Sequence, residues 1–297
     1  MDIIIQLKAF EPKHKFFIGV DSDGCAFDAM GIKHTKVFIP IAIKLWGLEK
    51  IEKEYIETAE FVNLYSDLRG INRFPGLLLT LEYLEERTDV KQSGVKLPDY
   101  SALREFVNLN VPLSNSSLKK FAEGRKDKFL TELIEWSESG DKLFSELTEG
   151  LQPFAFVKEA LKMACRQADT MIVSAASTVG LNKDWGEAGI LKYMTLVAGQ
   201  EVGGKKEQLQ YAVHGKYGEN CILMVGDAPG DMKAAKANNA LFYPINPGHE
   251  IESWERFYKE GYEKFITGQY AGEYENRLIE EFLKLLPHEK PWTTISK

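Results

Sequence analysis

The sequence has no hydrophobic run long enough to cross a membrane. Its best apolar stretch, Val37 to Ile43, is far shorter than the roughly 20 residues that a membrane helix needs. The opening residues, MDIIIQLKAFEPKHKFF, lack the basic leader and long apolar segment of an export signal. We therefore expect a soluble, cytoplasmic protein with no membrane partner.

Positive charge is also in short supply. Lys and Arg number 37 against 44 Asp and Glu, so the formal net charge is −7. No basic patch stands out along the chain, and a nucleic-acid partner is therefore not expected.

Cysteine and histidine are too few and too scattered for a thiol or imidazole metal site. Cys25, Cys165 and Cys221 are odd in number and share no close ligand spacing, which is typical of reduced thiols. The five histidines are dispersed as well. We therefore interpret the cysteines and histidines as structural residues.

Several short apolar runs end abruptly in small or acidic residues. The runs are Phe16 to Val20, Met171 to Val173, Met194 to Ala198, Cys221 to Val225 and Ala240 to Ile245. Such runs, separated by helix-like stretches, are typical of parallel strands covered on both faces. We predict an α/β fold with a doubly wound, Rossmann-like parallel sheet, which keeps its ligands at the carboxyl ends of the strands.

Helical periodicity fills the stretches between these runs. Examples are Phe154 to Gln167, Lys205 to Tyr217 and Pro229 to Asn239, the last with proline in its first turn. Near the end of the chain, Tyr274 to Leu286 shows the same periodicity.

Residues 31–150 contain no convincing strand. They show amphipathic helical patterns instead, clearest at Val37 to Trp46, Leu77 to Glu86 and Lys128 to Leu147. A segment of this length between two neighbouring strands is too long for a loop. We predict an all-helical cap domain at 31–150, inserted into a core domain made of 1–30 and 151–297.

Four carboxylates follow two of the predicted strands. Asp21 and Asp23 come after the first strand, and Asp227 and Asp231 follow the run Cys221 to Val225. If these strands were neighbours, the carboxylates would converge and raise one another's pKa values. A hard cation would relieve the repulsion, and an all-oxygen ligand set suits Mg²⁺.

Further residues could bind a phosphate at the same edge of the sheet. Lys205 or Lys206 opens a helix after the third run, Met194 to Ala198, and Ser174 follows the second run with Ala175 behind it. An ammonium group, a hydroxyl and unhindered backbone amides are the donors that a phosphate needs beside an anionic nucleophile. Taken singly, Ser174 is more often a turn residue and a lysine pair is more often a solvated helix start.

With these four segments in order, the chain resembles the haloacid dehalogenase superfamily of hydrolases. The segments are IGVDSDG at 18–24, IVSAAS at 172–177, GGKKEQL at 203–209 and VGDAPGD at 225–231. The resemblance covers the core but matches 31–150 only as a helical cap inserted after the first motif.

The resemblance implies a mechanism through an aspartyl-phosphate. Asp21 would be the nucleophile, and Asp23 would act as acid to the leaving group and then as base to water. Asp227, the Asp21 carboxylate and the Asp23 backbone carbonyl would hold Mg²⁺, supported by Asp231. The leucine four positions after Lys205 favours that lysine over Lys206.

One cap segment also has a counterpart in that superfamily. The stretch Leu68-Arg69-Gly70-Ile71-Asn72-Arg73 looks like the segment by which β-phosphoglucomutase and its relatives place an arginine over the substrate phosphate. That likeness would make Arg73 a substrate-binding residue. The alternative is a surface arginine that bridges cap helices.

Other interpretations of the motifs are weaker. As an EF-hand loop, Asp21-Ser22-Asp23-Gly24 fails because its fifth, sixth and twelfth positions are Cys25, Ala26 and Ile32. The stretch 199–206 nearly matches a nucleotide-binding P-loop, with Asp227 as its acid. However, Lys206 stands where a hydroxyl must ligate Mg²⁺, and this interpretation leaves Asp21 and Asp23 without a role.

These observations predict a Mg²⁺-dependent phosphatase that hydrolyses a small phosphorylated metabolite. A phosphomutase of the β-phosphoglucomutase type is the main alternative, because it uses the same core residues. The cap would decide between the phosphatase and the phosphomutase, since its closure controls water access. The substrate and the oligomeric state are not apparent from the sequence.

Overall fold

The computed structural model describes residues 3–293 and divides into two compact units. The core unit comprises the described residues up to Ala29 together with Glu149–Leu286, and the helical unit comprises Met30–Thr148 and the described residues from Pro287 to Thr293. These divisions fall within two residues of the predicted 30/31 and 150/151 boundaries.

The segment after Leu286 differs from the prediction, which assigned it to the core domain. Its aromatic side chain Trp292 packs against Phe61 and Tyr83 and lies under the guanidinium of Arg87, all in the helical unit. An aromatic contact of this kind has no periodicity that a sequence pattern could reveal.

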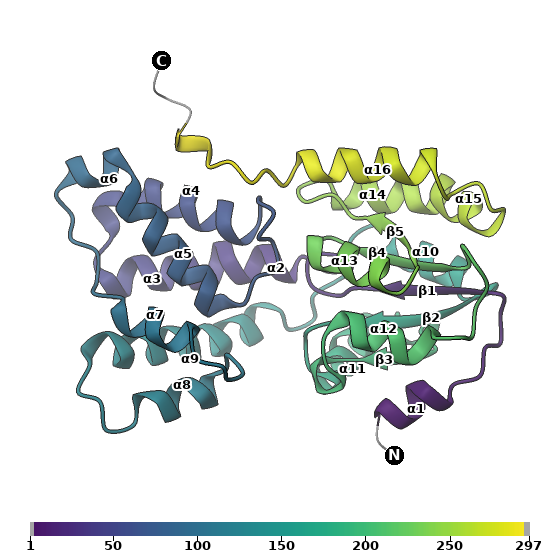
Figure 1. Ribbon diagram of the computed structural model, residues 1–297, viewed down its shortest axis with the longest axis horizontal. Helices are drawn as coiled ribbons and strands as arrows, with labels where there is room; N and C mark the ends of the chain where they lie inside the picture. The colour runs from purple at the N-terminus through teal and green to yellow at the C-terminus, as the bar shows by residue number, and fades with distance from the viewer. Residues whose placement is uncertain (1–2, 294–297) are drawn as a thin grey trace. The chain divides into compact units, whose positions relative to one another are not determined.

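The core unit contains a five-stranded, all-parallel sheet (Figure 1), as predicted. The strands are β1 (Phe16–Val20), β2 (Ala168–Val173), β3 (Leu196–Ala198), β4 (Ile222–Gly226) and β5 (Leu241–Pro244). Their order in space is β3-β2-β1-β4-β5. The order reverses between β1 and β4, and the carboxyl ends at such a reversal are where open α/β sheets bind ligands.

Helices cover both faces of the sheet, as the doubly wound prediction requires. Phe17 packs in one apolar cluster with residues of α1 (Ile3–Ala9), α12 (Lys205–Val213), α13 (Pro229–Ala237) and α16 (Glu273–Lys284). Its neighbour Phe16 contacts Phe265 of α15 (Tyr262–Ile266). Adjacent strand residues point to opposite faces, so these two contacts mark the two helical layers.

The remaining elements of the core unit are short connections and covering helices. They are α10 (Val157–Ala164), α11 (Thr178–Glu187), η3 (Leu191–Tyr193), η4 (Gln200–Val202), α14 (Glu250–Arg256) and the π-helix η5 (Phe257–Gly261). The helix predicted at Tyr274 to Leu286 is α16, shifted by one or two residues.

The helical unit has no strand among its described residues. Its elements are α2 (Ala29–Ile32, at the boundary), η1 (Lys33–Phe38), α3 (Ile39–Trp46), η2 (Glu49–Ile51), α4 (Glu52–Asn63), α5 (Arg73–Glu86), α6 (Thr88–Ser93), α7 (Ser101–Val107), α8 (Asn115–Ala122), α9 (Lys128–Leu147) and η6 (Pro291–Thr293). They enclose an apolar core of their own, with Leu81, Leu103 and Leu133 fully buried. A separate core is what allows this segment to be a domain.

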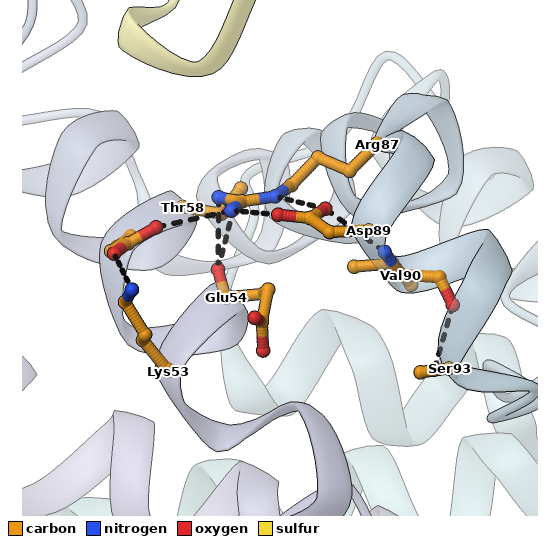
Figure 2. Close-up of polar contacts among 8 residues, drawn as sticks. Lys53, Glu54, Thr58, Arg87, Asp89, Val90 and Ser93 are labelled. Carbon is orange, nitrogen blue, oxygen red and sulfur yellow. Dashed lines mark hydrogen bonds and ion pairs between the residues drawn. The ribbon is translucent and has the colours of Figure 1, made fainter. Parts of the chain in front are cut away.

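A buried arginine ties three helices of this unit together (Figure 2). Arg87 lies between α5 and α6, and its Nη2 is 3.0 Å from Glu57 Oε2 and 2.7 Å from Asp89 Oδ2. Its Nη1 donates to Thr58 Oγ1 at 3.2 Å and reaches the backbone carbonyl of Glu54. Because these contacts join the end of α5 to α4 and α6, Arg87 is a structural residue of the helical unit.

Among residues 3–293, no helix combines the length and the apolar composition that a membrane crossing requires.

Candidate active site

The nucleophile predicted from the sequence lies at the carboxyl end of the central strand. Asp21 directly follows β1 and is buried, and its amide donates to the carbonyl of Val225 in β4 at 3.0 Å. Ser22 then accepts backbone hydrogen bonds from Cys25, Ala26 and Phe27. The segment is therefore a turn, as its composition alone suggested, and this turn also carries the two acidic residues.

Glycine is required at the sharpest point of this turn. Gly24 has φ of 83°, in the left-handed region that residues with a Cβ rarely adopt, and its amide donates to the carbonyl of Phe27 at 2.8 Å. The backbone around Asp23 is consequently held by the conformation and hydrogen bond of Gly24 rather than by the Asp23 side chain.

Two fully buried tryptophans hold the same turn, and neither was predicted as a site residue. Trp185 of α11 donates its indole N–H to Ser22 Oγ at 3.0 Å, and Trp254 of α14 donates to the carbonyl of Cys25 at 2.8 Å. Both contacts are long-range, so only the folded structure shows them. They make the turn rigid, which suits a group that must be held in place before it reacts.

Three of the predicted carboxylates converge. Asp21, Asp227 and Asp231 are all buried, and each offers an oxygen that lies within 4.8 Å of the oxygens of the others. Asp231 comes from the first turn of α13 and accepts the amide of Ala228 at 3.1 Å. A Cβ at Gly226 would lie 2.4 Å from Asp231, so only glycine allows this approach.

Lys205 lies among these carboxylates. Its Nζ is 2.7 Å from Asp21 Oδ2 and 2.6 Å from Asp231 Oδ1. Lys206 is exposed, because successive residues on a helix point about 100° apart. Of the two lysines left open by the sequence, the structure brings only Lys205 to the cluster.

The charges of the cluster are strongly coupled. Burial raises the pKa of Asp21 to about 7 and that of Asp231 to about 6, although Lys205 opposes both shifts. Burial alone would lower the pKa of Lys205, but attraction to Asp21 and Asp231 outweighs it and raises that pKa. Proximity to Asp227 also raises the pKa of Asp21.

A divalent cation fits these residues. With all groups ionised, three carboxylates and one ammonium group sum to −2, a charge that burial makes costly unless it is compensated. The donor atoms are carboxylate oxygens, which suit a hard ion such as Mg²⁺. Asp21, Asp227 and Asp231 are the residues that could hold it.

The carboxylate of Asp23 lies outside this three-residue group. Asp23 is only partly buried, and it is close enough to contribute to the raised pKa of Asp21. The pKa of Asp184 in α11 is raised mainly by burial, and the charge of Asp23 adds to that rise. Asp184 was not predicted as a site residue, since an acid on an amphipathic helix has no distinguishing pattern.

Ser174 follows β2 at the same edge of the sheet. It is buried, and its hydroxyl accepts the amide of Ala176 at 3.2 Å, which is the turn role expected of a serine after a strand. Ala175, next to it, is exposed. In the sheet register, Val20 pairs with Ile172, so Ser174 is level with the turn that follows Asp21.

The 199–206 segment does not form a phosphate-binding P-loop. Gln200 donates its amide to Ala176, and Val202 donates its amide to Gly199. In a P-loop these amides would be directed at a bound phosphate. The nucleotide-hydrolase alternative therefore loses its structural basis.

Arg73 bridges helices within the helical unit. Its Nη1 lies 2.5 Å from Asp141 Oδ1 and 3.2 Å from Ser137 Oγ, both on α9, and its guanidinium stacks over Phe38. These contacts match the bridging alternative rather than a side chain held ready for a substrate phosphate.

No protein-family model matches the chain, and no curated protein matches it. Solved structures that do match include a haloacid dehalogenase-like hydrolase from Streptococcus pneumoniae, at 15% identity and a TM-score of 0.41, covering 81% of this chain and 90% of that one. A HAD-superfamily subfamily IA hydrolase from Geobacter sulfurreducens matches at 14% identity and a TM-score of 0.40, covering 78% of this chain and 88% of that one. YfnB from Bacillus subtilis, described as a HAD-hydrolase bound to magnesium, matches at 13% identity and a TM-score of 0.42, covering 77% of this chain and 86% of that one.

The α/β fold stands on the parallel sheet and its strand order.

Proposed function

We propose that this protein is a Mg²⁺-dependent phosphatase of the haloacid dehalogenase type that acts on a small phosphorylated metabolite. The observation that carries the proposal is the position of Lys205, whose ammonium group contacts both Asp21 and Asp231 beside buried Asp227. A nucleophilic carboxylate, its cationic partner and a cation-binding acid pair are thereby gathered at one point.

The reaction would proceed in two steps. The Asp21 carboxylate attacks phosphorus and the bond to the leaving oxygen breaks, while Asp23 gives that oxygen a proton. Asp23 then takes a proton from water, which attacks the aspartyl-phosphate, releases inorganic phosphate and restores Asp21. Asp23 is partly exposed, as a group that exchanges protons with water in every cycle should be.

Charge compensation decides whether Asp21 can act at neutral pH. Its pKa is raised to about 7, so a fraction of the side chain is protonated there. When bound, Mg²⁺ would supply positive charge that favours the ionised carboxylate and offsets the charge of the phosphate. Lys205 does the same from the protein side through its 2.7 Å contact with Asp21.

The phosphoryl oxygens would be bound by Lys205, by Ser174 and by the backbone amide of Ala175. Lys206 and Arg73 are left out of this assignment, because one is exposed and the other is paired with Asp141.

A phosphate-release screen over phosphorylated sugars, nucleotides and cofactors tests the proposal, with hexose 1-phosphate isomerisation measured alongside. Phosphate release without isomerisation supports the phosphatase. Isomerisation with little release supports the phosphomutase alternative, and no reaction with any of them contradicts both.

A further inference from the structure

Gln208 is buried completely, one helical turn after Lys205 in α12. Its Nε2 donates to the carbonyl of Ser174 at 2.8 Å, and to those of Gly199 and Gly203 at 3.1 and 3.0 Å. The first carbonyl follows β2 and the other two belong to the loop after β3. A single carboxamide therefore connects two loops at the carboxyl edge of the sheet.

The orientation of this carboxamide is fixed. Reversing it would place Oε1 against three carbonyl oxygens, all of which are acceptors. In the observed orientation, Oε1 is buried without a hydrogen-bond partner among the described residues. Because an unsatisfied buried acceptor is unfavourable for folding, stability alone is a poor reason for glutamine at this position.

Peptide geometry shows what the three contacts achieve. In a trans peptide, the carbonyl of one residue and the amide N–H of the next point in opposite directions, and no described peptide bond is cis. With the carbonyls of Ser174 and Gly203 directed at Gln208, the N–H groups of Ala175 and Gly204 point away from it.

These two amides are available donors. Neither the amide of Ala175 nor that of Gly204 donates a hydrogen bond to another residue in the described part of the chain, and both residues are exposed. By contrast, the amide that follows Gly199, that of Gln200, is already bonded to Ala176. Gly204 immediately precedes Lys205, whose ammonium group contacts Asp21.

We propose that Gln208 is the positioning residue of the phosphate site. It holds two peptide groups so that the amides of Ala175 and Gly204 are directed as donors to the phosphoryl oxygens. Preorganised amides stabilise the charge that develops in the transition state. This inference rests on the proposed phosphatase function and assigns it a residue that contacts neither the substrate nor the reacting atoms.

Gln208→Met tests the role, because methionine keeps the length and volume but removes the donor. Steady-state kinetics are measured with the substrate found in the screen, together with inhibition by orthovanadate and the Mg²⁺ concentration for half activation. We expect kcat to fall by about 10-fold or more and the vanadate inhibition constant to rise by a similar factor. The Mg²⁺ midpoint should stay unchanged, since no carboxylate of the cluster is altered.

Gln210→Met is the matched control. It makes the same substitution on the exposed side of the same helix, and it should keep wild-type kcat and vanadate inhibition. If Gln208→Met lowers the melting temperature but keeps both constants, Gln208 is only structural and the proposal is wrong. A parallel loss of kcat and Mg²⁺ affinity also contradicts it, because that result indicates general damage to the site.

A measurement on the unaltered protein covers the case in which Gln208→Met does not fold. In the ¹⁵N-labelled wild type, added inorganic phosphate should shift the amide signals of Ala175 and Gly204. If both amides fail to respond while other site residues shift, the proposal is wrong and the phosphatase function stands. If the wild type releases phosphate from no compound, the proposed function fails, and this role fails with it.

Discussion

The ammonium nitrogen of Lys205 lies 2.7 Å from Oδ2 of Asp21, although the two residues come from distant parts of the chain. Asp21 follows β1, and Lys205 begins α12 at the same edge of the sheet. Burial disfavours the charge on both groups. Their proximity partly offsets this effect for Asp21 and outweighs it for Lys205. This ion pair is the structural basis of the predictions below.

Replacing Lys205 by Met should abolish most activity, whereas Lys206→Met should have little effect. The first change removes the cation between Asp21 and Asp231, and the second alters an exposed residue. We expect kcat/KM to fall by about 100-fold or more for Lys205→Met. Small, equal losses in the two variants would show that the lysine of this site has been assigned incorrectly.

Mg²⁺ should stabilise the protein as well as activate it. The cation would offset the formal charge of −2 on Asp21, Asp227, Asp231 and Lys205. At 100 times its dissociation constant, a ligand that binds only the folded state adds about 2.7 kcal/mol to the free energy of unfolding. Thermal unfolding with and without Mg²⁺ should therefore show a higher Tm in its presence, and chelation should remove activity reversibly.

Asp227→Asn should eliminate most of that Mg²⁺-dependent rise in Tm, and Glu219→Gln, at an exposed acid outside the cluster, should not. An equal rise in both variants would place the cation elsewhere.

Trp185→Phe should loosen the turn that carries Asp21. The change removes the N–H that donates to Ser22 Oγ and leaves that hydroxyl buried, at a cost of about 1–3 kcal/mol in the free energy of unfolding. We also expect a lower kcat with little change in KM, since substrate contacts are unaltered. Urea unfolding and steady-state kinetics measure both effects.

Trp46→Phe provides the comparison, because the indole nitrogen of Trp46 has no hydrogen-bond partner among the described residues. It makes the same change in ring size without losing a hydrogen bond. If it lowers kcat as much as Trp185→Phe does, the hydrogen bond to Ser22 is not responsible.

His34 should make the helical unit less stable in acid. Burial, reinforced by Lys33, Arg69 and Arg73, lowers the pKa of His34 from 6.5 to about 3. The unfolded chain therefore binds a proton below pH 6.5 that the folded chain does not, and stability is lost as pH falls toward 3. Between about pH 7.5 and about pH 5, this contribution amounts to about 2 kcal/mol.

In His34→Gln the loss of stability over this pH range should be smaller by that amount, as measured by urea unfolding at the two pH values. An identical pH dependence in the variant and the wild type would show that His34 does not titrate differently in the folded state.

The sequence predicted the sheet and three of its carboxylates well, because both depend on local pattern. Apolar runs ending in Asp21 and Asp227 place acids at strand ends, and any sheet that makes those strands neighbours brings the acids together. The contacts of Trp185, Trp254 and Gln208 could not be predicted. Each joins segments that are distant in sequence or depends on the direction of one side chain.

The choice between Lys205 and Lys206 shows the same limit. The leucine four positions after Lys205 favoured that lysine without excluding Lys206, and the phase of α12 determines that Lys205 faces the cluster. Arg73 is a related case. The resemblance suggested a contact with the substrate, but the guanidinium of Arg73 instead forms an ion pair with Asp141.

The most direct measurement is the turnover of Asp21→Asn with a generic phosphomonoester and saturating Mg²⁺. Asparagine keeps the shape of the side chain but cannot form the aspartyl-phosphate, so activity should fall by about 1,000-fold or more. In the wild type, borohydride trapping during turnover should convert Asp21 to homoserine, detected by mass spectrometry. Near wild-type turnover by Asp21→Asn, or trapping at another residue, would contradict the assignment of Asp21 as the nucleophile.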